Sequence, residues 1–343
     1  MPCQLFSPIQ PRAARSGVPG ATQVVGRAAK RNLCQSFSGG YVITRSIAEF
    51  SARAALLEPA APGCARGAFL VTPHGFHLAE QSASDNRYMV MDSGVDPRAA
   101  LAEHAALARR VSSLLPTVCF PGDPATPDAV FPNNVFATAP GRLIIGHMRH
   151  PVRQREAERP DIRGFFHSLL GYEEVDLSAM SGIAELTGSL VIDRARGIGY
   201  CGLSERCDPA GAAAMHAAFK LNLTFCFDLA PGEYHTNVVM SVLAGRALLI
   251  APDGFADPAV AQAIAALYAP RTLVISAAQK ADYAGNCIAL SDDTVWMSAR
   301  AAASLDPAAC DMLAAWGFRI EAVALAEIEK AGGSLRCCVG EIY

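Results

Sequence analysis

The sequence predicts an α/β fold in which a strand–strand–helix–strand unit recurs five times and closes into a five-bladed ββαβ α/β-propeller. Two observations predict this fold class. An Asp-Pro step that suits the start of a helix recurs at intervals of about fifty residues. Short strand-like segments precede and follow these helices. Five such units in a ring would place the helices outside and the strand ends around a central channel.

The helices are predicted from their first residues. Asp is a favourable N-cap residue, and Pro is favourable at the first helical position. The four clear markers are Asp96-Pro97, Asp208-Pro209, Asp257-Pro258 and Asp306-Pro307. A fifth helix is expected in the charged amphipathic stretch 154–170, which contains Pro160 and Asp161.

The strands are predicted on both sides of these helices. Short apolar segments follow them at 117–120, 223–226 and 272–275, and strand pairs with a turn precede them at 189–200 and 238–250. This order excludes the helix-free kelch blade and the simple alternation of a Rossmann fold. A generic α/β protein with accidental Asp-Pro spacing is the alternative.

Composition limits the classes of partner. The 343 residues are 51% hydrophobic and 18% charged, with a formal net charge of −3 and no basic face, so a small molecule is a better partner than nucleic acid. No apolar run approaches the roughly 20 residues of a membrane helix. Eleven cysteines without a Cys-x-x-Cys pair indicate reduced thiols in the cytoplasm. Neither a metal nor another cofactor is expected.

Residues 1–66 differ from the rest and are assigned to a basic leader, which leaves a single domain at 67–343. Six basic residues precede the first acidic residue, Glu49: Arg12, Arg15, Arg27, Lys30, Arg31 and Arg45. Such a segment is typical of an organelle-targeting peptide, although a start codon assigned too far upstream or a disordered tail gives the same pattern.

Five polar residues share the phase of the repeat. Asn133, Glu185, His235, Asn286 and Cys337 follow one another at steps of about fifty residues. In a closed ring, each unit would therefore direct one of them into the same channel. Cysteine and histidine supply a nucleophile and a general acid and base, and a carboxylate can orient the imidazole. Taken singly, a core thiol, a capping histidine and a turn carboxylate are the commoner interpretations.

Six motifs in order carry a family resemblance. They lie at 76–86, 127–134, 185–194, 234–237, 285–286 and 332–337. On these motifs, residues 68–343 resemble the pentein superfamily, whose fold is a five-bladed ββαβ propeller and whose enzymes modify guanidine groups. The most similar branch is the citrulline-utilisation hydrolase or amidinotransferase-like family. Leu186 departs from it, because that family more often has glycine after the glutamate.

The resemblance implies that Cys337 is the nucleophile, His235 the acid and base, and Glu185 the catalytic-site carboxylate. Cys338 is expected to pack against the helices, because neighbours in a strand face opposite sides. Arg336 is implied to lie near the substrate. The residues assigned to substrate binding are Asp128, Asn133, Asn134, Asn237, Asn286 and Arg336. For Arg87 and Arg206, a solvated surface position is preferred over recognition of a substrate carboxylate.

The amides favour a neutral substrate. Enzymes normally surround a guanidinium with carboxylates, yet Asn133, Asn134, Asn237 and Gly188 stand at the corresponding places. Conversion of citrulline to ornithine is therefore preferred over arginine chemistry. Four other enzymatic functions stay open: arginine deiminase, arginine dihydrolase, dimethylarginine hydrolase and amidinotransferase. A pentein-fold binding protein is the alternative without catalysis. For the oligomeric state, a homodimer stays open.

Overall fold

The computed structural model describes residues 42–92 and 94–343, which belong to one compact unit, Gly39–Tyr343. The described part of the chain forms five sheets. In each sheet a first strand pairs antiparallel with a second, and the second pairs parallel with a third. A helical segment connects the second strand to the third, as the sequence predicted.

The strands fall into five blades, numbered here in chain order from the blade that contains β2. Blade 1 contains β16 (Gly340–Ile342), β2 (Gly67–Val71) and β3 (Thr117–Phe120), and blade 2 contains β4 (Phe136–Ala139), β5 (Arg142–Ile145) and β6 (Glu173–Asp176). Blade 3 contains β7 (Leu190–Asp193), β8 (Ile198–Leu203) and β9 (Leu223–Asp228). Blade 4 contains β10 (Met240–Leu243), β11 (Ala247–Ile250) and β12 (Thr272–Val274), and blade 5 contains β13 (Ile288–Ser291), β14 (Thr294–Ser298) and β15 (Arg319–Val323).

The blades close into a ring through their first strands. β16 contacts β4, β7 contacts β10, and β10 contacts β13, while the turn before β7 reaches β4 and the turn before β16 reaches β14. Blade 1 is completed by the C-terminal strand, because Gly340 pairs with Phe69 of β2. A Cβ atom at residue 340 would lie 2.2 Å from the Phe69 ring, so only glycine fits this closure. The predicted propeller is confirmed.

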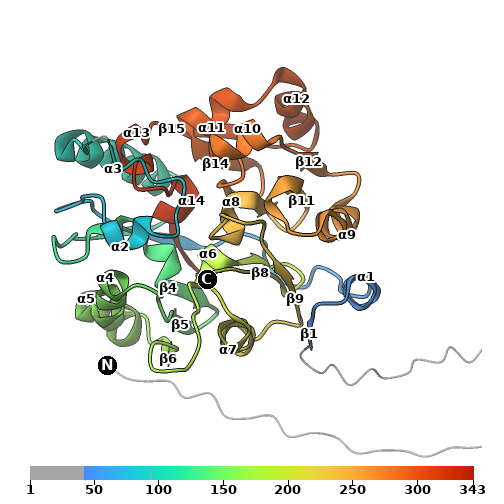
Figure 1. Cartoon of the computed structure of the whole chain (residues 1–343), viewed down its shortest axis with the longest axis horizontal. Helices are drawn as coiled ribbons and strands as arrows, with labels where there is room; N and C mark the ends of the chain where they lie inside the picture. Colours follow the sequence, from blue (N-terminus) through green and yellow to red (C-terminus); the bar gives the residue numbers. More distant parts are fainter. Residues whose placement is uncertain (1–41, 93) are drawn as a thin grey trace, which may run out of the picture. The chain divides into compact units, whose positions relative to one another are not determined.

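The long helices lie on the outside of the ring and the short turns α6, α8 and α14 near its centre (Figure 1). The outer helices are α3 (Pro97–Ser112), α5 (Pro160–Gly164), α7 (Pro209–Phe219), α9 (Pro258–Tyr268) and α12 (Pro307–Ala315), with α11 (Ala299–Ser304) before α12. The side chains of Asp96, Asp208, Asp257 and Asp306 accept backbone N–H groups at the helix starts, so the four Asp-Pro predictions are confirmed.

The helix predicted over 154–170 is broken into several turns. These are α4 (Pro151–Gln154), η3 (Arg155–Glu158), α5 and the π-helical turn η4 (Phe165–Leu169). Pro160 does start α5, but Asp161 is not its cap. Instead the Asp161 carboxylate forms an ion pair with Arg159, at 2.5 Å. Proline at residue 160 cannot donate the backbone hydrogen bond that a continuous helix requires, which explains the break.

The predicted leader boundary at residue 66 is wrong. Residues Val42–Thr44 form β1, which pairs parallel with β9, and Ile47–Ala54 form α1. Phe50 of α1 is fully buried and stacks on Phe225, with ring centroids 4.3 Å apart. Residues 42–54 therefore belong to the folded unit, because α1 supplies part of the core of blade 3. Residues 1–41 of the predicted leader lie outside the described residues. Among the helices that the structure describes, none has the length and apolar character needed to cross a bilayer.

Candidate active site

The five residues that share the repeat phase all lie immediately before the first strand of a blade. Asn133 is in η2 (Pro132–Asn134), Glu185 and His235 are the N-cap residues of α6 (Leu186–Ser189) and α8 (Thr236–Val239), Asn286 precedes β13, and Cys337 is in α14 (Leu335–Cys338). All five are buried, and the turns η2, α6, α8 and α14 contact one another in sequence around the centre. The repeat therefore delivers one polar residue per blade to the same place.

Cys337 faces two amide groups. Nδ2 of Asn286 donates to its Sγ atom at 3.3 Å, and Nδ2 of Asn237 lies 3.8 Å from the same sulfur. Burial raises the pKa of the Cys337 thiol, and a hydrogen bond to the Ser334 backbone, the Asn286 amide and the charge of Arg336 only partly oppose this effect. The resting residue is therefore a thiol, and both amides are placed to stabilise negative charge once the proton leaves.

His235 is held by the carboxylate of Glu185. Its Nε2 atom lies 2.9 Å from Oε2 of Glu185, whereas its Nδ1 atom has no hydrogen-bond partner within the described residues. Burial lowers the pKa of His235, and the nearby carboxylate only partly offsets this effect. The arrangement is a neutral imidazole that donates from Nε2 and presents Nδ1 as a base.

Arg206 keeps Glu185 ionised. Its Nη1 atom lies 3.3 and 3.2 Å from the two oxygens of Glu185, and its Nε atom donates to Asp85 at 2.8 Å. Burial raises the pKa of the Glu185 carboxyl, but the charge of Arg206 and the hydrogen bond from His235 outweigh burial, and the resulting pKa is below its usual value. The surface position preferred for Arg206 is wrong, because its side chain is only 2% exposed. Arg87, by contrast, is half exposed and pairs with Glu233.

A pocket opens beside these residues. Its lining includes the predicted residues Cys337, His235, Asn134 and Asp128, and also Ser82, Asn86, Phe131, Arg153, Arg206 and Tyr234. Asp128 is buried, accepts a hydrogen bond from Ser82 Oγ at 2.5 Å, and forms no ion pair within the described residues. Arg153 is buried in an ion pair with Glu156 at 2.9 Å and donates to the Phe131 carbonyl at 3.0 Å. The pocket therefore combines a nucleophile, a base, a carboxylate and guanidinium groups.

Several amide atoms at this site lack partners within the described residues. Both side-chain polar atoms of Asn133 are unpaired, as are Oδ1 of Asn134 and Oδ1 of Asn286. Asn237 is better satisfied, because its Nδ2 atom donates to the Thr187 carbonyl at 3.1 Å and its Oδ1 atom accepts from Nδ2 of Asn286 at 3.3 Å. Buried polar atoms without partners are costly. Asn134 lines the pocket, whereas Asn133, Asn237 and Asn286 do not.

Gly188 allows Asn134 and His235 to approach each other. A Cβ atom at residue 188 would lie 2.5 Å from Oδ1 of Asn134 and 2.7 Å from Nδ1 of His235. These are two of the atoms without partners, so any larger residue would occupy the space that they face. Nearby Leu186, where the family more often has glycine, has φ = 21° and a buried side chain. Leu186 thus has a positive φ without being glycine.

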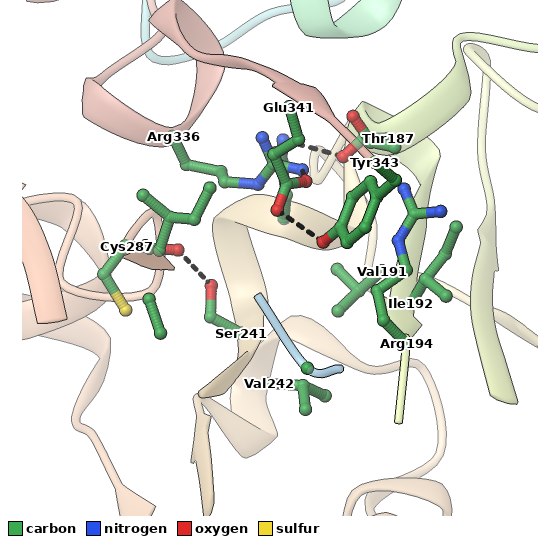
Figure 2. Close-up of a pocket in the computed structure, with 14 residues that line it drawn as sticks. Thr187, Val191, Ile192, Arg194, Ser241, Val242, Cys287, Arg336, Glu341 and Tyr343 are labelled. Atoms are coloured by element: carbon green, nitrogen blue, oxygen red, sulfur yellow. Dashed lines mark hydrogen bonds and ion pairs between the residues drawn. The ribbon is translucent and has the colours of Figure 1, made fainter. Parts of the chain in front are cut away.

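Arg336 does not reach this pocket. It lines a second cavity, in which its Nη2 atom donates to Oε2 of Glu341 at 2.8 Å and the hydroxyl of Tyr343 donates to Oε1 of the same carboxylate at 2.8 Å (Figure 2). The resemblance implied that Arg336 lies near the substrate, but its guanidinium pairs with Glu341 and does not line the pocket that Cys337 and His235 line. Residues 335–338 form a helical turn rather than the predicted strand, and neighbours in such a turn point about 100° apart. Cys338 is fully buried in the cluster that includes Leu107 and Val111 of α3, as expected.

Sequence reasoning missed several lining residues. Tyr234, whose hydroxyl donates to the Gly332 carbonyl at 2.5 Å, was inside a motif and adjacent to His235. Ser82 and Asn86 were also inside the first motif, but nothing in their spacing distinguished them. Arg153 lies directly before the charged amphipathic stretch 154–170 in which a helix was predicted. Its burial depends on the ion pair with Glu156 and on the Phe131 carbonyl, and no local pattern signals it. Among the described residues, no group of three or more His, Cys, Asp or Glu side chains could hold a metal ion.

A family model and two individual proteins are similar to the chain in sequence. Residues 72–343 match the family model described as "N,N dimethylarginine dimethylhydrolase, eukaryotic". The uncharacterized protein ZK1307.1 of Caenorhabditis elegans is 23% identical over 219 residues, which are 62% of this chain and 72% of that protein. The uncharacterized protein YkgA of Bacillus subtilis is 23% identical over 248 residues, which are 72% of this chain and 81% of that protein.

Solved structures share the fold. The N-terminal domain of ArgZ, an arginine dihydrolase from the ornithine-ammonia cycle in cyanobacteria, matches 80% of this chain and 97% of its own, with a TM-score of 0.69 and 18% identity. A dimethylarginine dimethylaminohydrolase adduct matches 81% of this chain and 100% of its own, with a TM-score of 0.63 and 21% identity. The chain therefore belongs to the N,N-dimethylarginine dimethylhydrolase family of the pentein superfamily, whose members are hydrolases of carbon–nitrogen bonds in guanidino compounds.

Proposed function

We propose that this protein hydrolyses the ureido group of citrulline to give ornithine, with Cys337 as the nucleophile. The observation that carries the proposal is the charge of the pocket wall. Its only carboxylate among the lining residues of the described chain is Asp128, and it also contains Arg153 and Arg206. Amides stand at the remaining positions around the thiol.

The balance of charges favours a neutral reacting group. An amino acid substrate brings one carboxylate, which the guanidinium group of Arg153 can bind, and one ammonium group, which the Asp128 carboxylate can bind. Arginine would add a second cation. Glu185 is not free to pair with that cation, because it already accepts hydrogen bonds from Arg206, His235 and the backbone N–H of Arg149. A ureido group needs only hydrogen-bond donors and acceptors, which amides provide.

The proposed reaction begins with proton transfer from the Cys337 thiol to Nδ1 of His235. The thiolate then attacks the ureido carbon, and the imidazolium gives its proton to the δ-nitrogen as the bond to that nitrogen breaks. Ornithine leaves, and an S-carbamoyl group stays on Cys337. The amide N–H groups of Asn237 and Asn286, which already face the sulfur, are suited to stabilise the thiolate.

The second half of the reaction restores the thiol. His235 Nδ1 accepts a proton from water, and the resulting hydroxide attacks the carbamoyl carbon. The carbon–sulfur bond breaks, and the sulfur takes the proton back from the imidazolium. The carbamate that is released decomposes to ammonia and carbon dioxide. Glu185 keeps the imidazole oriented and stabilises its charged form in both halves.

Hydrolysis of N,N-dimethylarginine is the second candidate. The family match over residues 72–343 favours it, and Asp128 could pair with a guanidinium because it forms no ion pair within the described residues. In that reaction Cys337 would attack the guanidinium carbon and dimethylamine would leave, so that citrulline would be the product rather than the substrate.

Steady-state kinetics on citrulline, arginine and N,N-dimethylarginine separate the candidates. Ornithine, citrulline and ammonia are measured as products, with Cys337→Ala as the inactive control. The proposal expects the highest kcat/KM for citrulline, with ornithine formed. A higher kcat/KM for N,N-dimethylarginine, with citrulline accumulating, would reject it in favour of the second candidate. If ammonia is released from arginine with a higher kcat/KM than from citrulline, the preference for a ureido group is rejected as well.

A further inference from the structure

Three buried thiols lie together behind the active site in blade 3. Sγ of Cys201 in β8 lies 3.6 Å from Sγ of Cys207, and Cys201 also faces Cys226 across the paired strands β8 and β9. All three side chains belong to one buried apolar cluster. None of them takes part in the reaction proposed above. Their grouping is chemically notable because two neighbouring thiols are the reactants of a disulfide.

We propose that Cys201 and Cys207 form a reversible disulfide when the protein meets a peroxide, and that this bond reduces the activity of the site. A disulfide holds its sulfur atoms about 2.05 Å apart, so the two sulfur atoms must approach each other by roughly 1.5 Å. The effect on activity rests on the proposed function, whereas the formation of the bond does not.

Cys207 is the one of the three thiols that lies outside the β8–β9 ladder, and it is held by isolated bridges to Ser204 and Ala184. It ends the turn Ser204–Cys207, in which the two end residues form an isolated β-bridge and exchange backbone hydrogen bonds of 3.1 and 3.2 Å. Cys201 and Cys226, by contrast, lie opposite each other in the ladder of adjacent parallel strands. Closing a bond between those two would distort the ladder, whereas a turn can shift at lower cost.

The chemistry balances with hydrogen peroxide as the oxidant. One thiolate attacks a peroxide oxygen, the O–O bond breaks, and a sulfenic acid and water form after protonation. The second thiol then attacks the sulfenic sulfur, and the departing hydroxyl leaves as water. Two thiols and one peroxide thus give one disulfide and two waters, with both sulfurs oxidised and both peroxide oxygens reduced. The small oxidant suits thiols that are buried in the protein.

The turn Ser204–Cys207 carries Arg206 directly before Cys207. The Arg206 carbonyl accepts from Ser189 Oγ at 3.3 Å and from the Glu185 backbone N–H at 3.4 Å, while its guanidinium contacts the Glu185 carboxylate. Displacing Cys207 therefore also displaces the Arg206 guanidinium, which holds the Glu185 carboxylate. Because Glu185 orients His235, the imidazole is displaced as well. Misplacement of about 1 Å at a catalytic centre can cost on the order of 100-fold in rate, so we expect at least about a tenfold loss of kcat/KM.

The test oxidises the full chain with hydrogen peroxide and compares wild type with Cys207→Ser and Cys207→Ala. Non-reducing peptide mapping by mass spectrometry should find a linked Cys201–Cys207 peptide in wild type only. Peroxide also oxidises Cys337, so the activity that the Cys207 variants lose measures that effect alone. The activity of oxidised wild type should fall about tenfold further than that of the variants, and dithiothreitol should remove this additional loss. Cys119→Ala, at an exposed thiol of blade 1, should behave as wild type.

Two results would overturn the inference. One is a linked Cys201–Cys226 peptide, or none, after peroxide treatment. The other is an equal and equally reversible loss of activity in wild type and both Cys207 variants. Unfolding midpoints of the reduced proteins identify a variant that has failed to fold, and the serine variant serves if the alanine variant fails. If the reduced wild type does not act on citrulline, the proposed function fails, but the peptide map still decides whether the disulfide forms.

Discussion

His235 Nε2 lies 2.9 Å from Oε2 of Glu185, while Nδ1 of the same ring has no partner within the described part of the chain. The carboxylate accepts a hydrogen bond, so the ring proton must be on Nε2 and Nδ1 must carry the lone pair. The contact thus selects the tautomer in which the imidazole is a base on the side opposite Glu185. It also joins blades 3 and 4, because Glu185 precedes β7 and His235 precedes β10.

Glu185→Gln should lower kcat by about 100- to 1,000-fold with a smaller effect on KM, since the amide neither fixes the tautomer nor stabilises the imidazolium. The pKa of His235, already lowered by burial, should fall further without the carboxylate. The measurement is kcat against pH. Glu205→Gln is the control, because Glu205 is mostly exposed. Equal activity of the two variants would remove Glu185 from the mechanism.

Cys337→Ala should abolish turnover, with kcat at least about 10,000-fold lower, and no mass increase should appear after incubation with citrulline. Cys338→Ala should keep kcat within about threefold and cost roughly 1 kcal/mol of stability, since Cys338 is packed in an apolar cluster. Intact mass spectrometry and ornithine assays check both variants. Ornithine production by Cys337→Ala would contradict a covalent mechanism.

The fold and much of the site were predictable from the sequence because both repeat. Asp-Pro steps define helix starts by local hydrogen bonding, and strand ends at equal phase meet in any closed ring. Thus Glu185, His235 and Cys337 were found without knowing their neighbours. Periodicity identifies which turn a residue occupies, and it does so even where the turn is helical rather than extended.

What repeats do not encode was predicted less well. Arg206 was assigned to the surface because its burial depends on Asp85 and Glu185, which are distant in sequence. Arg336 was placed near the substrate by the family resemblance, and the motif does not report that its guanidinium pairs with Glu341 in a second cavity. The segment 42–54 was assigned to a leader on composition, yet pairing with β9 is a tertiary event that composition does not report.

Gly188→Ala should reduce kcat by roughly 100-fold, because the new methyl group would collide with Asn134 and His235. Gly164→Ala is the matched control: nothing lies within 4 Å of its Cβ position, and alanine favours its helix α5. Circular dichroism verifies that both variants fold, and kcat is measured for each. Unchanged kcat in Gly188→Ala would show that this space is not used in the reaction.

Asn134→Asp should shift the substrate preference from citrulline toward arginine. A carboxylate at this position of the pocket would add an anion beside Asp128, which suits a guanidinium and disfavours a neutral ureido group. The ratio of kcat/KM for arginine to that for citrulline should rise by about tenfold or more, which corresponds to about 1.4 kcal/mol. Asn222→Asp, at an exposed residue that precedes β9, is the control. A ratio that stays constant would contradict the role given to the amides.

His104 should make the fold sensitive to acid. It is buried on α3, and burial, with a smaller effect of His74, lowers its pKa from 6.5 to about 4. The folded protein therefore keeps His104 neutral over a range in which the unfolded chain binds a proton. The contribution of the neutral His104 to the free energy of unfolding is fully present above pH 6.5. It falls by up to about 1.4 kcal/mol per pH unit as the pH drops toward 4.

His104→Leu should remove this contribution, because leucine fills the site without a titratable group. Between pH 7 and pH 4.5 the free energy of unfolding of wild type should fall by roughly 2 kcal/mol more than that of the variant. Urea unfolding at several pH values measures the difference, and His77→Leu, at an exposed histidine, should match wild type. If wild type and His104→Leu lose stability in parallel, another group governs the acid response, and the buried imidazole is protonated as readily in the fold as in the unfolded chain.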